Sequence, residues 1–220
     1  MAFAEIERLL REGRLGAAEE LILAFSADAS GEDLALLAGH LADLAGEYAR
    51  LGRVEDSARA RGLLGELAGG GEELLRARAD VALINAWLDQ AGTPEALELL
   101  RGMPGFPPAG GALPEGELQR LVLTAFVNIL SALADGRDVS GAEELFGEFW
   151  GKAHEPANSD LMALAALNAV IVRVHAGRAR EAAALAAELE GYGEGEETRR
   201  YCARASKIVN DLLDGGPQGA

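Results

Sequence analysis

The sequence predicts an all-helical protein made of about five helix-turn-helix repeats and one final helix. Apolar residues recur with the 3.6-residue period of an amphipathic helix along almost the whole chain, and no segment alternates as a half-buried strand does. Aromatic residues make up only 5% of the 220 residues, a composition that favours close packing of helices over sheets. A short phrase also recurs at a near-constant interval.

Each copy of this phrase is an apolar helix, then Gly and usually Arg, then a small residue about five positions later. The glycines recur at intervals of roughly 40 residues, at Gly13, Gly52, Gly92, Gly136 and Gly177. Gly ends the first helix of a pair because it accepts the left-handed conformation. The small residue lets the two helices of the pair approach closely. A regular interval of this kind indicates a repeat array, in which stacked pairs bury surface that one pair cannot bury alone.

The periodicity predicts where the helices and the breaks between them lie. The expected helix pairs are 3–12 with 15–26, 32–51 with 54–68, 72–91 with 94–103, 116–135 with 139–153, and 158–176 with 179–190, followed by a final helix at 195–213. Breaks are expected at 69–71, 104–114, 155–156 and 191–195, where Gly and Pro gather. We therefore expect one domain over 1–214, with a flexible interruption at 104–114 and a disordered tail at 215–220.

Charge and cysteine usage restrict the partners and the compartment. The net charge of −16 would repel a phosphate backbone and an anionic membrane surface, so we expect neither nucleic acid nor membrane as a partner. The single cysteine, Cys202, excludes an intramolecular disulfide framework and fits a reducing compartment. The first residues mix apolar and charged side chains, unlike a signal peptide. These features predict a cytoplasmic protein.

The sequence contains no recognisable catalytic, metal or nucleotide motif. His40, His154 and His175 are far apart and do not have metal-ligand spacing. Pairs of glutamates fall mostly in expected first turns of helices, where carboxylates complement the helix dipole. The glycines at 69–71 lack the Lys-Ser/Thr of a phosphate loop. We therefore predict a protein that is not an enzyme and uses no cofactor or metal.

Two stretches carry a family resemblance. Leu44–Gly52 contains the pattern Leu-small-x-x-Tyr-x-x-x-Gly, and Ala18, Ile22 and Phe25 supply a small residue followed by bulky ones. In these features residues 3–190 resemble the tetratricopeptide repeat family. The resemblance implies a right-handed α-α superhelix (a solenoid) with a C-terminal capping helix, and a role in binding another protein. The repeats are longer than that family's unit of about 34 residues. In length they resemble the divergent repeats of bacterial regulators of the maltose-activator type.

A second helical-repeat family, the pentatricopeptide proteins, binds single-stranded RNA and carries an Asn early in each first helix. Asn85, Asn128 and Asn168 are candidates for that position. The distance from each Asn to the glycine that follows it differs from one copy to the next, however, so the three do not share one register. Because the net charge also opposes RNA binding, this alternative is not favoured.

In tetratricopeptide proteins the first helix of each pair lines a concave groove. Counting back from each glycine places Gly46 in this groove together with Arg50, Ala86, Gln90, Phe126, Val127, Leu130, Asn168, Ile171 and His175. The set is largely small and apolar, which suits the apolar face of an amphipathic partner helix and implies an adaptor, scaffold or chaperone-like protein. The same residues would also suit a core between helix pairs. Two other functions stay open: self-association into a homo-oligomer, and a ligand or peptide sensor that acts with a separate output protein.

Overall fold

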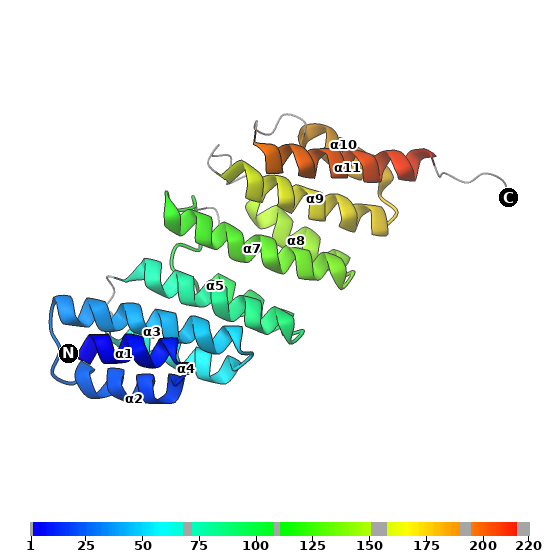
Figure 1. The fold of residues 1–220 in the computed structure, drawn as a ribbon. Coiled ribbons are helices and arrows are strands. Elements are labelled where there is room, and N and C mark those ends of the chain that lie inside the picture. The colour runs from blue at the N-terminus through cyan, green and yellow to red at the C-terminus, as the bar shows by residue number, and fades with distance from the viewer. Residues whose placement is uncertain (1, 68–71, 108–110, 151–157, 190–194, 215–220) are drawn as a thin grey trace. The chain divides into compact units, whose positions relative to one another are not determined.

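The computed structural model describes residues 2–67, 72–107, 111–150, 158–189 and 195–214, and over these residues the chain is helical with no strand (Figure 1). The helices are α1 (Ala2–Arg11), α2 (Leu15–Ser26), α3 (Glu32–Arg50), α4 (Val54–Leu67), α5 (Glu73–Asp89), α6 (Thr93–Arg101), α7 (Glu117–Asp135), α8 (Val139–Phe149), α9 (Ser159–His175), α10 (Ala179–Leu189) and α11 (Glu196–Asp214). The predicted all-α class is confirmed. The predicted breaks at 69–71 and 155–156, residues 191–194 of the predicted break at 191–195, and the predicted tail lie outside the described residues.

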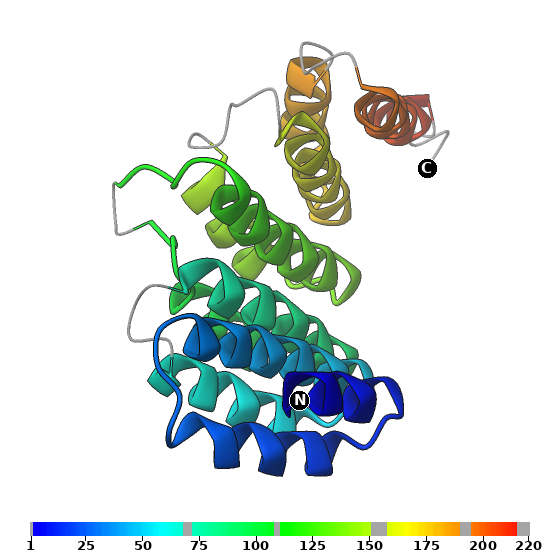
Figure 2. The ribbon, with the colours of Figure 1, turned by 60° about the vertical axis from the view of Figure 1, so that its left-hand side comes forward.

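The helices form two compact units, Met1–Ala125 and Phe126–Ala220, and the division falls within α7. In the first unit consecutive helices from α1 to α6 pack against each other, and α3 also packs against both α1 and α5 (Figures 1 and 2). In the second unit α9 packs against α8, α10 and α11, and α10 packs against α11. Packing is therefore between near neighbours in the chain, and a first helix contacts both its partner and the first helix of an adjacent pair.

Apolar side chains from one face of each helix make the core of the first unit. Its fully buried members include Ile6, Ile22, Leu37, Leu41, Leu44, Tyr48 and Leu64. In the second unit the rings of Phe126 and Phe149 stack with their centroids 4.4 Å apart. The α11 helix takes the place of a further first helix, since it contacts α9 and α10 as α3 contacts α1 and α2. Ala205 and Val209 are buried in α11.

By length and composition alone, α7 is the one described helix that is apolar enough to cross a membrane. Its mean hydropathy is 1.3, but 56% of that stretch is buried inside the protein, as in a packed core helix. The predicted interruption at 104–114 is partly described. Pro107 and Leu113 are both buried there, so these parts of the segment pack against the protein.

The turns between paired helices correct the predicted repeat register. One residue in each of these turns has a positive φ, between 58° and 71°, and these turn residues are Gly13, Gly52, Ala91, Arg137 and Gly177. Ala91 and Arg137 each lie beside the glycine predicted for that turn. Gly92 instead has a φ of −84°, and a Cβ there would lie 2.7 Å from Cε3 of Trp87, so this glycine is needed for space. The first three turn residues are therefore evenly spaced along the chain, which the first three glycines are not.

Candidate binding cleft

The structure places five of the predicted groove residues in the core. Ala86, Phe126, Val127 and Leu130 are at most 3% exposed and belong to the core. Asn168 is 7% exposed, and its side chain donates a hydrogen bond to Oγ of Ser131 at 2.6 Å. A partner cannot reach these side chains in this conformation. The corrected register accounts for Ala86 and Leu130, which lie six positions before Gly92 and Gly136, because each of these glycines lies next to the actual turn residue.

The other predicted groove residues are accessible but divide between the two units. Arg50 is exposed and pairs with Glu47 at 2.7 Å. Gln90 is exposed, and its side-chain amide donates to the carbonyl of Gly52 at 2.9 Å, which ties two successive turns together. In the second unit Ile171 is half-buried and His175 is exposed. Neither unit therefore contains the whole predicted set, and a binding role for these four stays a prediction.

Counting back from the turn residues instead of from the glycines gives a consistent surface. The side chains two positions before each turn residue are all exposed: Arg11, Arg50, Asp89, Asp135 and His175. The residues six positions before each turn residue are exposed or half-buried: Glu7, Gly46, Asn85, Ser131 and Ile171. The accessible side of the first helices therefore carries mainly small and polar residues, whereas the sequence predicted a mainly apolar groove.

In the first unit this accessible side borders a cleft of about 730 Å³. Its lining comes from three first helices: Glu7, Leu10 and Arg11 of α1, His40, Ala42, Asp43, Gly46 and Glu47 of α3, and Leu75 and Arg78 of α5. Sequence reasoning anticipated Gly46 here and missed the rest. Glu7 and Arg11 stand at the same distances from Gly13 as Gly46 and Arg50 do from Gly52, so the same count applied to the first repeat would have found them.

The cleft is hollow because α3 carries small side chains at this point. Ala42 and Gly46 leave the space open, and a Cβ added to Gly46 would meet nothing within 4 Å. Leu10 and Leu75 supply apolar lining on either side. Leu36 is 52% exposed and lies one helical turn before His40 on the same face of α3. The cleft thus has apolar surface beside its charged residues.

The charged groups of the cleft are only partly paired. Arg78 bonds to Glu117, and Glu47 is bonded by Arg50. Arg11 donates from Nε to the backbone carbonyl of Glu7 at 3.2 Å.

The Glu7 and Asp43 side chains have no hydrogen-bond or ion-pair partner in the described part of the chain. His40 has its ring stacked on that of Phe3, with centroids 6.1 Å apart. No three metal-ligating side chains gather anywhere among the described residues. The lining therefore offers a ligand apolar contact, two unpaired carboxylates and the Arg11 guanidinium.

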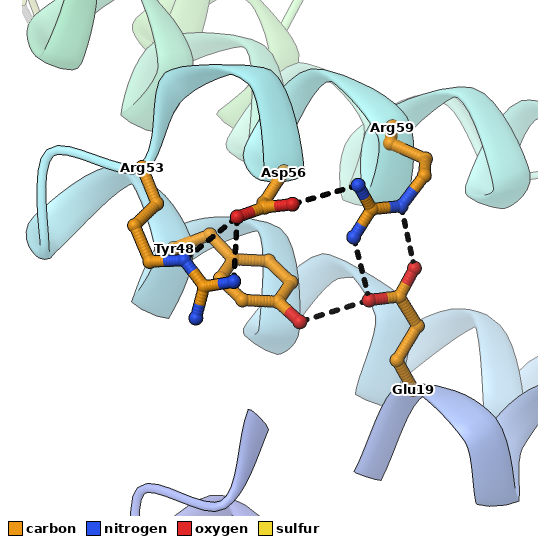
Figure 3. Close-up of polar contacts among 5 residues, drawn as sticks. All are labelled: Glu19, Tyr48, Arg53, Asp56 and Arg59. Atoms are coloured by element: carbon orange, nitrogen blue, oxygen red, sulfur yellow. Dashed lines mark hydrogen bonds and ion pairs between the residues drawn. The ribbon is translucent and has the colours of Figure 1, made fainter. Parts of the chain in front are cut away.

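A separate polar network joins α2, α3 and α4 (Figure 3). Glu19 is only 8% exposed, and it accepts hydrogen bonds from the Tyr48 hydroxyl at 2.8 Å and from Nε and Nη2 of Arg59 at 2.8 and 2.9 Å. Arg53 and Arg59 both donate to Asp56 at 2.7 Å, and the Arg53 guanidinium lies 4.5 Å from the centre of the Tyr48 ring. Because these groups bond to one another, this first network serves to hold three helices together.

The network changes the acidity of its members. The hydrogen bonds from Arg59, helped by the one from Tyr48, hold the pKa of the Glu19 carboxyl below its usual value despite burial. Burial, with the hydrogen bond to Glu19, raises the pKa of Tyr48 to about 12. Glu19 is therefore ionised and Tyr48 protonated at neutral pH.

A second network in α8, α9 and α10 uses the same positions relative to the turn residues. Glu143 accepts from Nε of Arg173 at 2.9 Å and from Nη1 of Arg178 at 3.0 Å, and Arg178 also pairs with Glu181. Glu143 follows its turn residue by six positions, as Glu19 does, and Arg178 follows its own by one, as Arg53 does. The recurring Gly-Arg of the sequence is thus explained in two repeats by an ion pair with an acid three positions later.

One further buried charge lies in the core, away from the cleft lining. Asp80 of α5 has no exposed surface, and Nε of Arg61 in α4 donates to it at 2.6 Å. Burial raises the pKa of Asp80, an effect that the hydrogen bond from Arg61 opposes. The pair links two helices of the first unit, and neither residue belongs to the lining of the cleft.

Comparison with other proteins adds no identification. No known protein family matches the chain, and no characterised protein or solved structure matches it either. The resemblance to tetratricopeptide repeats therefore stays a prediction. The function has to be inferred from the cleft and from the helices that form it.

Proposed function

We propose that this chain is a non-enzymatic interaction module that binds a segment of another protein in the cleft between α1, α3 and α5. The observation that carries the proposal is the open space over Gly46 on the accessible side of three packed first helices. Its volume of about 730 Å³ is within the usual range of ligand sites. The cytoplasm is the compartment we expect.

The arrangement of helices supports a binding role of this type. Near-neighbour packing, with evenly spaced turn residues in the first three repeats, is what stacked helix pairs require. We propose that the pairs stack as a right-handed solenoid of the tetratricopeptide kind, with α11 as the cap. In such an array the first helices supply a continuous side on which an extended or helical segment lies.

The lining favours a peptide segment over a small metabolite. Because residues from three separate helices contribute to the lining, the cleft runs across the helices and is not a deep pocket between two of them. The lining combines polar and apolar groups, as do the interfaces of complexes that form and separate. Leu36, half exposed beside the cleft, offers further apolar contact for a longer ligand.

Filling the cleft at Gly46 tests the proposal. A Gly46→Leu variant should keep the fold, since nothing lies within 4 Å of an added Cβ and Leu favours a helix over Gly by about 0.5–1 kcal/mol. Gly62→Leu is the matched control because Gly62 is also a helical glycine with open space around it, on α4 and outside the cleft.

The measurement is cross-linking mass spectrometry of the wild type and both variants after capture from cells of the source organism. We expect cross-links between partner peptides and α1, α3 or α5 in the wild type and in Gly62→Leu, and their loss in Gly46→Leu. If Gly46→Leu retains the same partners and the same cross-links, the cleft is not the binding site.

Self-association is the second candidate, and one observation favours it. Leu23 and Phe25 of α2 are 40% and 42% exposed, although both are large apolar side chains. Light scattering over a range of concentrations tests this function. A mass that rises with concentration in the wild type, and stays that of a monomer in Leu23→Glu, would support a contact through α2.

A further inference from the structure

We propose that the segment bound in the cleft is basic as well as apolar, with a Lys or Arg side chain held by Glu7 and Asp43. This inference rests on the proposed function, since it names the chemistry of the ligand for the same cleft. The neighbouring apolar side chain of the ligand contacts Leu10 and Leu75.

The charges of the lining carry this inference. Five ionised side chains line the cleft, and two of them, Glu47 and Arg78, already pair with groups outside it. Of the other three, Glu7 and Asp43 are acidic and Arg11 is basic, and Nε of Arg11 donates to the backbone carbonyl of Glu7. The lining therefore has one negative charge in excess, and both of its unpaired carboxylates are exposed, so that they can accept hydrogen bonds from a cationic ligand.

The rest of the molecule points the same way. A net charge of −16 over 220 residues concentrates cationic ligands near the surface and repels acidic ones. Among the described lining residues, Arg11 is the one cation without a carboxylate partner. An acidic segment that paired with Arg11 would also come close to the carboxylates of Glu7 and Asp43, which would repel it. A basic segment gains two carboxylates and meets one cation.

Selection from a library of random displayed peptides tests the ligand chemistry without assuming a sequence. The library is selected on the immobilised wild-type chain and depleted on Gly46→Leu, so that only cleft-dependent peptides remain. We expect the recovered peptides to carry more Lys and Arg than the input, next to Leu, Ile, Met or aromatic residues. Recovery of acidic or uncharged peptides would overturn the inference while the proposed function stands. Failure to recover any cleft-dependent peptide would overturn both.

A titration with the most enriched peptide locates the charge. Its affinity is measured by fluorescence anisotropy for the wild type, for a Glu7→Gln/Asp43→Asn double variant and for a Glu20→Gln/Glu55→Gln double variant. The control removes the same net charge from exposed acids of α2 and α4 outside the cleft. We expect a loss of about tenfold or more from the cleft variant and less than about twofold from the control. Equal losses would show that only the overall field of the protein attracts the peptide, and would overturn the assignment to Glu7 and Asp43.

Discussion

In both polar networks a carboxylate between packed helices accepts hydrogen bonds from side chains of neighbouring helices, but the donor side chains differ. In the first, the buried carboxylate of Glu19 is satisfied by Tyr48 and Arg59. In the second, the equivalent Glu143 is satisfied by Arg173 and Arg178. Tyr48 and Arg173 occupy the same position, four places before the turn residue. Either a hydroxyl or a guanidinium thus serves as the donor at this position of a first helix, when the second helix of the preceding helix pair carries the acid.

The difference between the networks lies in exposure. The side chain of Glu19 is 10% exposed, and that of Glu143 is 23% exposed. The Tyr48 ring has no exposed surface, so its hydroxyl cannot turn to water if Glu19 is lost. Arg173 and Arg178 keep 17% and 37% of their side-chain surface in solvent. The first network is therefore the one whose loss leaves a buried polar group without a partner.

Removing the central acid from each network should have the largest effect and should separate the two. We expect Glu19→Ala to lower the free energy of unfolding by about 2–3 kcal/mol, because it leaves the Tyr48 hydroxyl buried and unsatisfied. Glu143→Ala should cost about 1 kcal/mol or less, because its arginines can reach water. Urea denaturation measures both.

The two tryptophans allow each unit to be followed by itself, since Trp87 lies in the first and Trp150 in the second. In a Trp150→Phe background the fluorescence reports Glu19→Ala, and in a Trp87→Phe background it reports Glu143→Ala. Equal losses in the two units would show that burial does not distinguish the networks.

The second-largest effect we expect is a loss of stability in the first network at high pH. The pKa of Tyr48 is raised to about 12 in the folded chain from an ordinary value of 10.0, so its contribution is fully present below pH 10 and is lost as pH rises towards 12. Tyr48→Phe should remove this pH dependence and cost about 1.5–2 kcal/mol at neutral pH, the value of a hydrogen bond to a charged group.

The check is the urea midpoint reported by Trp87 at several pH values between 9 and 12, in the wild type and in Tyr48→Phe. The opposite sign holds for Glu19, whose lowered pKa makes its contribution present above pH about 4.5 and lost as the solution becomes more acidic. If Tyr48→Phe loses stability above pH 10 as steeply as the wild type, another group is responsible for the alkaline transition.

The local sequence was sufficient to predict the helices, but it was insufficient to predict which of their residues lie on the accessible surface. Apolar periodicity and the glycines predicted α2 as it is, and most other helix ends to within two positions, because amphipathic faces and helix ends are local properties. The accessible side depends on differences of a single position in register. Counting six positions back from Gly136 selects Leu130, which is core, whereas the same count from Arg137 selects Ser131, which is half-buried.

The networks and the cleft were missed for a related reason. The bond between Tyr48 and Glu19 joins residues 29 positions apart, and a pattern within one repeat does not show it. The sequence does carry one sign of the network: an acidic residue six positions after one turn residue, with Gly-Arg at the following turn. Glu19 and Gly52-Arg53 are an example. The cleft depends on what is absent from α3 at Gly46, and small residues in a sequence do not reveal whether neighbours fill the space above them.

The smallest predicted effect concerns the turns that shifted the register. Ala91 and Arg137 have φ values of 59° and 58°, a conformation that costs a residue with a side chain about 1–2 kcal/mol relative to glycine. Ala91→Gly and Arg137→Gly should therefore each stabilise their unit by about 0.5–1 kcal/mol, after the entropy that glycine adds to the unfolded chain is subtracted. The shift in urea midpoint, read through Trp87 and Trp150 respectively, measures the gain.

The neighbouring glycine supplies the contrast that makes this prediction specific. Gly92→Ala should destabilise the first unit, because its Cβ would lie 2.7 Å from the Trp87 ring and 3.2 Å from the Trp87 carbonyl oxygen. If glycine alone marked the turn, as the sequence pattern suggested, Ala91→Gly would add only flexibility and would lower the midpoint. A gain at Ala91 together with a loss at Gly92 would instead establish that the first three repeats share one repeat length, and that the third glycine is kept to make room for a tryptophan.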